Sequence, residues 1–551
     1  MKQTTFDSPG PGVWQLDQSH VSRPLTRFLR ERYCRAYEEG QTIALSRYGM
    51  PLRTIAARPV NGFLFIQPIP LMGPPGGAPP PPLFLKLLNA IVPTLRRCAR
   101  TADAALANRQ WRTDAHRWRD EVWPALQDRY ETLQRLDLHG LDDAELHAHL
   151  DATVDAFHDS MVAHFDTGPA TMIPTGKLLG IVEDHIEVSP TEVLAAVGGR
   201  SSVVERDTAA LVALQAAIAE VGEEVLSGDP AAVLQSLRQR DDAIGEAART
   251  WLERVECRLV WAGDVYLPTA KELPQLLVEQ LRVPPFQHDA ARTDTVAAEL
   301  RSRLPESARE TFDQALEEAR YTAFLRDERC AVNDAWAGGL VRLALLEVGR
   351  RLRERELLED AEHAIHLTPD ELEGLLTRGE GPSGAEVAAH AVDQTQTTDD
   401  APAFLGGDPL PPPPVDGMPR AIAEMMAGIF RYVDLMEGDL GSYDDDVLRG
   451  TPASPGEYIG VARLVCGPAD FRRVRPGDVL VARTTMPSYN GALAVAGAVV
   501  TDRGGALSHA AIVSRELGIP AVVATINGTK VIADGARLRV DGSRGRVEVL
   551  S

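Results

Sequence analysis

The sequence predicts a multidomain fold, with a large, mainly α-helical N-terminal domain that contains a small β element and a compact α/β domain after it. The chain has 551 residues, which is more than one hydrophobic core normally accommodates. Between residues 83 and 376, apolar side chains recur at spacings of three and four, as in amphipathic helices. After residue 454, short β-branched runs alternate with helical segments and glycine turns, which is typical of an α/β domain.

Stretches rich in proline, glycine or acidic residues mark the expected boundaries. We expect the mainly helical domain to cover residues 1–384 and the α/β domain to cover residues 454–551. Residues 385–453 contain a run of four prolines and an acidic, turn-rich segment at 441–453. We expect them to form a Pro-rich linker, a short helix and a hinge.

Individual elements can be assigned from local patterns. Residues 142–165 and 321–360 have helical periodicity, and the second segment is long enough for one extended helix or a helix pair. Residues 189–197 begin with a capping Ser or Thr, and residues 62–71 are the strand candidate of the first domain. The strands expected in the last domain are residues 479–484, 497–502, 520–525, 537–542 and 546–550.

The composition excludes several classes of partner. A formal net charge of −22 disfavours nucleic acid and anionic membranes, because both bind basic surfaces. The sequence contains neither an uninterrupted apolar run of about 18 residues nor the apolar core of a signal peptide. Five cysteines without a CxxC pair indicate reduced thiols, so we expect a cytoplasmic protein. We expect no metal site, because the spacing of His158 and His164 directs them to opposed faces of one helix.

One histidine, His509, is expected at the start of a helix. The predicted strand GAVVTD runs into the turn RGG and then into ALSHAAIVSRELG, where Ser508 suits the N-cap and Gly518 the C-terminal cap. Free N–H groups and the positive end of the helix dipole favour an anion there. A neutral imidazole in that position is suited to act as a nucleophile toward phosphorus. The alternative is that His509 only caps or packs at the junction.

The surrounding sequence resembles a known family. TDRGGALSHAAIVSRELGIPAVV, together with SPGEYIGVARLV and PGDVLVARTTMPSY, is similar to the swivelling phosphohistidine domain of the PEP-utilising enzymes. The resemblance covers about residues 454–551 and implies that His509 accepts a phosphoryl group at one site and delivers it at another. By position, the candidates for holding the phosphoryl group are Ser508, Gly504, Gly505, Arg483 and Thr484.

The N-terminal part resembles the substrate-binding domain of rifampicin phosphotransferase. VWQLDQSHVSRPLTRFL (13–29), residues 47–68 and residues 195–211 carry this weaker similarity. Asp17, His20, Arg23, Asn61 and Gly62 match its motif positions, and both catalytic and folding roles stay open for them. His164 lies where relatives also tend to have histidine. Relatives carry Gly-His-Arg where this chain has Glu256, Cys257 and Arg258.

The expected activity is phosphotransfer with the help of a second protein. Residues 168–180 superficially resemble a phosphate loop, but Leu178 stands where that motif has Ser or Thr. We therefore expect no directly bound cofactor, with ATP and Mg²⁺ used by a separate ATP-binding subunit that charges His509. By resemblance, the β-phosphoryl group of ATP passes through histidine to a hydroxyl of a small, apolar acceptor. The alternatives are a phosphorylation-coupled dehydratase of natural-product biosynthesis and a non-catalytic regulatory phosphocarrier.

Overall fold

The computed structural model describes residues 5–17, 20–21, 23–77, 80–198, 201–260, 264–282, 290–396, 401–408, 415–437, 443–444, 447–485 and 489–550. The chain divides into two compact units, and each unit draws on three segments of the chain. Unit 1 comprises Met1–Ile173, Cys257–Thr269 and Glu328–Ala427, and unit 2 comprises Pro174–Glu256, Ala270–Asp327 and Gly428–Ser551. None of the described helices is both long enough and apolar enough to span a membrane.

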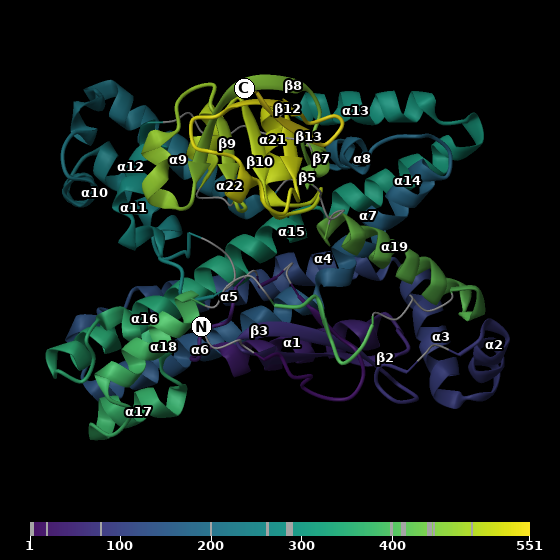
Figure 1. Cartoon of the computed structure of the whole chain (residues 1–551), viewed down its shortest axis with the longest axis horizontal. Coiled ribbons are helices and arrows are strands. Elements are labelled where there is room, and N and C mark those ends of the chain that lie inside the picture. The colour runs from purple at the N-terminus through teal and green to yellow at the C-terminus, as the bar shows by residue number, and fades with distance from the viewer. Residues whose placement is uncertain are drawn as a thin grey trace. The chain divides into compact units, whose positions relative to one another are not determined.

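Unit 1 is mainly helical, as the sequence predicted (Figure 1). The segment predicted as a helix over 142–165 is α6, and the segment 321–360 contains two α-helices with a π-helical segment, η5, between them. The helices are α1 (Arg30–Arg47), α2 (Pro82–Ile91), α3 (Pro93–Ala107), α4 (Gln110–Arg117), α5 (Trp123–Gln134), α6 (Asp143–Asp166), η5 (Arg329–Trp336), α16 (Ala337–Glu354), α17 (Pro369–Arg378) and α18 (Gly384–Gln396). The helices α7 (Gly168–Glu183) and α19 (Arg420–Glu437) each contain a boundary between the units.

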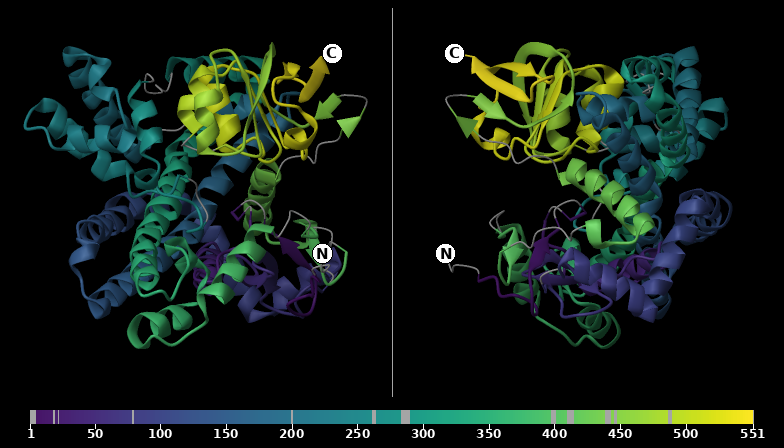
Figure 2. Two further views of the ribbon diagram at one scale, coloured as in Figure 1. Left: turned by 60° about the vertical axis from the view of Figure 1, so that its left-hand side comes forward. Right: turned by 90° about the vertical axis from the view of Figure 1, so that its right-hand side faces the viewer.

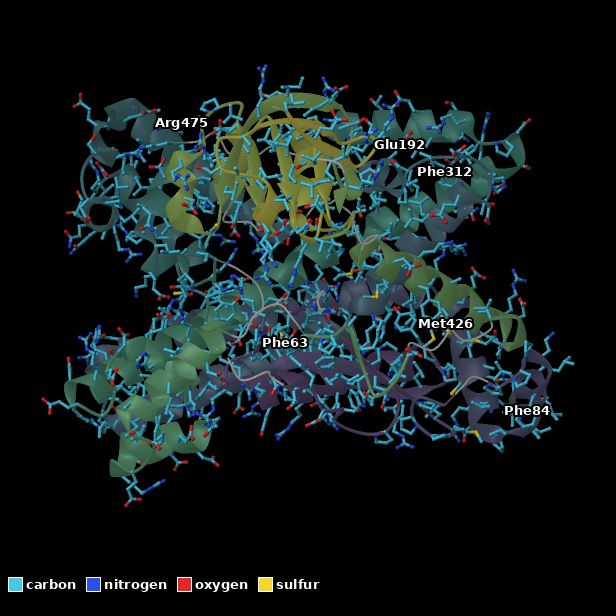
Figure 3. All side chains as sticks on the ribbon, viewed as in Figure 1. Phe63, Phe84, Glu192, Phe312, Met426 and Arg475 are labelled. Atoms are coloured by element: carbon cyan, nitrogen blue, oxygen red, sulfur yellow. The ribbon has the colours of Figure 1, made fainter. Side chains whose placement is uncertain are left out.

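The β element of unit 1 is an antiparallel sheet. Its described strands are β1 (Trp14–Leu16), β2 (Leu52–Val60), β3 (Phe63–Pro70) and β4 (Phe404–Leu405), in the order β2-β3-β1-β4. The strand predicted over 62–71 is β3. Asn61 and Gly62 join β2 to β3 with φ values of 50° and 83°, as a two-residue hairpin turn requires. These two motif positions therefore have a structural role. Phe63, labelled in Figure 3, belongs to the apolar cluster that this sheet buries.

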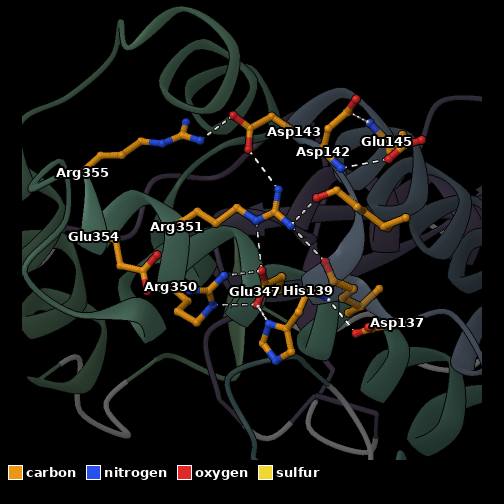
Figure 4. Close-up of polar contacts among 12 residues, drawn as sticks. Asp137, His139, Asp142, Asp143, Glu145, Glu347, Arg350, Arg351, Glu354 and Arg355 are labelled. Carbon is orange, nitrogen blue, oxygen red and sulfur yellow. Dashed lines mark hydrogen bonds and ion pairs between the residues drawn. The ribbon is translucent and has the colours of Figure 1, made fainter.

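A network of charged groups joins α16 to the start of α6 (Figure 4). The Arg351 guanidinium lies 2.9 Å from Oε1 of Glu347 and 3.1 Å from Oδ1 of Asp143. It also donates to the backbone carbonyl oxygens of Leu138 and Leu141, at 2.9 and 2.7 Å. Because this buried cation has carboxylate and carbonyl partners on several sides, its desolvation is offset and the two helices are held together.

Unit 2 combines a second group of helices with the C-terminal sheet. The helices that precede the sheet are α8 (Pro190–Val197), α9 (Ser202–Val221), α10 (Pro230–Arg238), α11 (Ala243–Val255), α12 (Pro274–Arg282), α13 (Ala290–Arg303), α14 (Glu306–Thr322) and α15 (Phe324–Glu328). Ser189 caps α8 by accepting a hydrogen bond from Glu192 N, as predicted. Phe312, labelled in Figure 3, is fully buried in the apolar cluster that joins α7, α8, α13 and α14.

The C-terminal sheet confirms the predicted α/β architecture. Its described strands are β5 (Tyr443–Asp444), β6 (Val447–Arg449), β7 (Thr451–Ser454), β8 (Glu457–Val465), β9 (Val479–Ala482), β10 (Ala498–Thr501), β11 (Ala521–Val523), β12 (Arg537–Asp541) and β13 (Arg546–Leu550). They follow the order β5-β6-β13-β12-β8-β9-β10-β11-β7. The strands β8, β9, β10 and β11 are parallel to their neighbours within this run. They lie side by side in Figures 1 and 2, where the C-terminal strands are yellow.

Both faces of the parallel strands are covered. Successive residues of β9, such as Leu480 and Val481, enter two different apolar clusters, because the side chains of a strand point alternately to its two faces. The helices α20 (Asn490–Val495) and α21 (His509–Leu517) cover one face, and α22 (Gly528–Val531) follows β11.

The described part of the segment predicted as linker and hinge contains regular elements. Helices α18 and α19 lie in residues 385–437, apart from the first residue of α18, and β5, β6 and β7 lie at its C-terminal end. Residues 397–400, 409–414, 438–442 and 445–446 of this segment lie outside the described residues. The expected domain boundaries stay predictions.

Candidate functional site

The carboxyl ends of three parallel strands meet at one edge of the C-terminal sheet. Ala482 of β9 pairs with Thr501 of β10, and Val500 of β10 pairs with Val522 of β11. The residues that follow these strands therefore come together, although the sequence separates them by about twenty residues. This edge of a parallel sheet is where ligands bind in open α/β folds.

The loop between β10 and α21 presents the start of the helix at this edge. Gly504 has φ of 110°, and a Cβ atom there would lie 2.7 Å from Cβ of Ser508. The residue is glycine because other residues rarely adopt this backbone and would collide with the cap. Ser508 is the N-cap, and its hydroxyl accepts a hydrogen bond from Ala511 N at 3.4 Å. His509 is thus the first residue of α21, at the positive end of the helix dipole.

The ring of His509 is half-buried and has a hydroxyl partner from the segment that follows β9. Nδ1 of His509 lies 3.0 Å from Oγ1 of Thr485, which is itself buried. Burial lowers the pKa of His509 to about 3, so the imidazole is neutral at pH 7. When Nδ1–H donates to Thr485, Nε2 carries the lone pair. The site therefore favours a neutral imidazole with a nucleophilic nitrogen.

Charged groups lie beside this site. Oδ1 of Asp502 accepts from Thr529 N at 2.8 Å, and its other oxygen accepts from the Thr529 hydroxyl. Burial raises the pKa of Asp502, and these hydrogen bonds together with the nearby Arg483 and Arg503 partly offset that rise. Arg503 N donates to the Arg483 carbonyl oxygen at 2.9 Å, so the segments that carry the two cations are joined through their backbones. Their guanidinium groups add positive charge to the edge, which favours an anionic ligand.

The C-terminal segment that contains His509 matches a protein-family model. Residues 474–545 match the model of the PEP-utilising enzyme, mobile domain.

Three relatives extend the comparison beyond the mobile domain. Chondramide synthase cmdD of Chondromyces crocatus is 26% identical over 575 residues, which cover 98% of this chain and 14% of that protein. The uncharacterized phosphotransferase YvkC of Bacillus subtilis is 30% identical over 243 residues, or 44% of this chain and 28% of that protein. Rifampicin phosphotransferase of Streptomyces sviceus is 28% identical over 325 residues, or 56% of this chain and 34% of that protein. Part of the chain is thus homologous to phosphotransferases, and the chain matches about a third or less of each relative's length.

Within the mobile domain, the predicted site residues occupy two neighbouring segments. His509, Ser508, Gly504 and Gly505 share the β10–α21 loop and helix start, whereas Arg483 and Thr484 follow β9. Gly505 is buried, and a Cβ atom there would overlap the backbone carbonyl oxygen of Leu435, so close packing by itself explains this glycine. Thr485 was not among the residues predicted from the sequence. The only signal for it was its place directly after Arg483 and Thr484.

The backbone after β11 is unusual at the same edge. Ala524 and Ile526 have φ values of 58° and 66°, a conformation that residues with side chains seldom adopt. Thr525 N and Ile526 N donate to the carbonyl oxygens of Thr501 and Asp502, at 3.0 and 2.8 Å. These bonds hold the strained turn against the end of β10.

The histidines considered as metal ligands have other neighbours. Among the described residues, no group of three or more His, Cys, Asp or Glu side chains is arranged to hold a metal ion. Nε2 of His158 lies 3.2 Å from Oε2 of Glu39, and Nδ1 of His164 lies 3.0 Å from Oδ1 of Asp334. Nδ1 of His185 lies 2.8 Å from the carbonyl oxygen of Ile181.

Proposed function

We propose that this chain is a phosphotransfer component that carries a phosphoryl group on His509 to a hydroxyl of a small, apolar molecule. The observation that carries the proposal is the neutral imidazole at the start of α21, next to a glycine loop, within a segment that matches the mobile domain. Homology of part of the chain to two phosphotransferases supports it.

In the loading step, Nε2 of His509 attacks the phosphorus atom of the donor. The new N–P bond forms as the bond from phosphorus to the donor's leaving oxygen breaks, and that oxygen keeps the electron pair. Nδ1 keeps its proton and donates a hydrogen bond to Oγ1 of Thr485. The phosphorylated ring is therefore cationic and lies beside the anionic phosphoryl group. The positive end of the α21 dipole and the cations Arg483 and Arg503 stabilise the negative charge. Gly504 and Ser508 shape the loop that receives it.

The donor in this proposal is a separate ATP-binding protein that uses ATP and Mg²⁺. The use of ATP is what the sequence resemblance to the PEP-utilising enzymes implies for the donor. Purified chain given ATP and Mg²⁺ is expected to gain no phosphoryl group until such a protein is added. Self-labelling of the purified chain would contradict this part of the proposal.

The acceptor is expected to be an alcohol on an apolar or polycyclic molecule. Rifampicin phosphotransferase is named for such an acceptor, which makes rifampicin the first probe. In the transfer step the acceptor oxygen forms a bond to phosphorus and loses its proton to a base or to water. The N–P bond breaks at the same time, and its electron pair returns to Nε2 of His509.

A second candidate function is phosphorylation-coupled dehydration. Almost the whole chain aligns with part of chondramide synthase, a protein named for biosynthesis rather than for inactivation. In this alternative the phosphate ester formed by His509 is a leaving group, and elimination releases phosphate and forms a double bond.

A direct test charges the chain chemically, so that no partner protein is needed. The full chain is treated with phosphoramidate, a small phosphoryl donor, and the modified histidine is located by peptide mass mapping. We expect the phosphoryl group on His509 in the wild type and in His158→Asn, and its loss from that peptide in His509→Asn. Modification of other histidines while His509 stays unmodified would overturn the proposal.

Adding acceptors to the charged chain separates the candidate functions. An acceptor that gains a phosphoryl group indicates phosphotransfer, and an acceptor that loses water with release of phosphate indicates dehydration. A phosphoryl group that stays on His509 in the presence of every alcohol, and moves only to a protein, indicates the regulatory phosphocarrier.

A further inference from the structure

Unit 1 contains two histidines that each lie beside a carboxylate and close to one another. Asp17 follows β1, and its Oδ2 lies 2.8 Å from Nδ1 of His20. Nδ1 of His164, on α6, lies 3.0 Å from Oδ1 of Asp334 in η5. The centroids of the two rings are 5.8 Å apart, with planes at 75°. The Asp17 carboxylate accepts from Nδ1–H of His20, which fixes the tautomer and leaves the lone pair on Nε2. His20 therefore has the arrangement of a general base, and His164 lies beside it in contact with a second carboxylate.

Aromatic side chains surround this pair of histidines. The ring centroid of Phe165 lies 5.2 Å from that of His20 and 4.9 Å from that of His164. Tyr37 of α1 contacts His20 edge-on with its ring centroid 6.0 Å away, and both Tyr37 and Phe165 are buried. The side chain of His20 itself keeps 21% of its surface exposed. A ligand that reaches His20 would therefore meet aromatic walls, which suit an apolar ring system.

The surroundings of the two histidines shift their pKa values in opposite directions. Burial is the largest single effect and lowers the pKa of His20, but the adjacent Asp17 and the nearby Asp334 together raise it by more, against Arg329, so the net shift is upward. Burial also lowers the pKa of His164, and there the Asp334 carboxylate offsets only part of the effect, while Arg329 and His20 lower it further. Titratable pairs with opposite shifts are typical of acid–base sites. His20 is the ring that gains a proton, and His164 stays neutral beside it.

A purely structural explanation accounts for the pair less well. Asn333, which precedes Asp334, has no exposed surface, and neither Oδ1 nor Nδ2 has a hydrogen-bond partner in the described structure. Buried amides are normally satisfied, so this segment of η5 has polar capacity that a ligand or water would use. π-helical segments also occur frequently at functional sites.

We propose that His20 and His164 form an acid–base pair in unit 1 that activates the hydroxyl group of the acceptor, an alcohol on an apolar ring system. This inference rests on the proposed function. The O–H bond of the alcohol breaks, and its proton goes to Nε2 of His20, whose charge Asp17 balances. The oxygen attacks the phosphorus of phosphorylated His509, the N–P bond breaks, and the electron pair returns to His509. His164 stays neutral, so His20 remains the group that takes the proton. Asp17 and Asp334 are positioning residues.

The first experiment needs no acceptor. The full chain is labelled with ¹³C on histidine, and the ring resonances are followed by NMR from about pH 5 to about pH 9, around the ordinary histidine pKa of about 6.5. The signals are assigned by their loss in His20→Gln and His164→Gln. We expect His20 to titrate above the ordinary value and His164 below it, and Asp17→Asn to lower the His20 midpoint by about one unit or more. His158→Gln is the control, because His158 lies on the same helix α6 but its Nε2 faces Glu39; it should leave both midpoints unchanged.

The second experiment measures discharge of phosphorylated His509 by rifampicin, or by whichever alcohol discharges it in the acceptor panel. His20→Gln is expected to slow discharge by about 10²-fold or more and to abolish the acidic limb of its pH profile, while the charging of His509 stays unchanged. Asp17→Asn is expected to move that limb to lower pH, an effect that a merely structural role would not produce.

The outcomes separate this inference from the proposed function. The acid–base pair is overturned if phosphorylated His509 is discharged in His20→Gln at the wild-type rate, or if both rings titrate independently at the ordinary pKa. Either result leaves phosphotransfer by His509 intact. If no alcohol discharges the wild type, the proposed acceptor class is wrong, and opposed midpoints in the titration then decide whether the two histidines are a coupled pair.

Discussion

Replacing Thr485 with Val tests how the site sets the reactive nitrogen of His509. The substitution keeps the shape of the side chain and removes the hydroxyl that lies 3.0 Å from Nδ1. A neutral hydrogen bond contributes about 0.5–1.5 kcal/mol, and an unpaired buried group costs about 1–3 kcal/mol. At about 1.4 kcal/mol per factor of ten, the cost of the unpaired group should slow the charging of His509 by about 5- to 140-fold.

The assay is the initial rate at which phosphoramidate charges His509, measured by peptide mass mapping. Thr485→Ser retains the hydroxyl and should charge within about twofold of the wild type, which makes it the matched control. Unfolding midpoints of the three proteins show whether the fold is preserved. A Thr485→Val variant that charges at the wild-type rate would refute the role of this hydroxyl.

Three other predictions concern protonation and stability. The pKa of His509 is lowered to about 3, so its charging rate per donor molecule should stay constant from about pH 8 to about pH 5. The charging rate of an imidazole with an ordinary pKa would fall about 30-fold over that range. A steep fall in the charging rate of His509 near pH 6.5 would contradict the prediction. Burial raises the pKa of Asp264 from 3.8 to about 6, although Thr26 and Val265 donate hydrogen bonds to its carboxylate. The protonated carboxyl group therefore adds to the free energy of unfolding below about pH 4, and this contribution is lost as the pH rises through 6. Between pH 4 and pH 7, the free energy of unfolding of Asp264→Asn should therefore rise by up to about 3 kcal/mol relative to that of the wild type, as measured by denaturant unfolding. A difference between the two proteins that stays constant with pH would be evidence against this prediction. Arg351→Met removes the cation that Glu347 and Asp143 share. Because Glu347 keeps Arg350 and Asp143 keeps Arg355, the substitution should destabilise unit 1 by about 1–3 kcal/mol, and an unchanged unfolding midpoint would show that the network in Figure 4 contributes little.

Local chemistry made much of the C-terminal domain predictable. The cap at Ser508 and the terminal Gly518 define α21 at the predicted residues, and Gly518 has φ of 69°, as expected for a left-handed cap. The β-branched runs correspond to β9–β13 within one or two residues at each end. These signals act over a few residues, so a linear pattern contains them.

Contacts between distant segments could not be predicted. Thr485 reaches His509 only because β9 and β10 are adjacent and parallel, and this strand order is not written in either segment. β1 and β4 have three and two residues, too few for a two-residue period to be recognised. Asp17 and His20 were noted from a motif, but their approach to His164 depends on packing within unit 1.

The interrupted course of the chain has a consequence for biosynthesis. β1 pairs with β4, and unit 1 receives its last segment only when residues 328–427 have been made. On the ribosome, the first 173 residues must therefore wait with part of their apolar surface uncovered while much of unit 2 emerges. Fragments cut at a single point in the linear map would leave this surface exposed, so complementation by two co-expressed halves is a better route to separated parts than truncation.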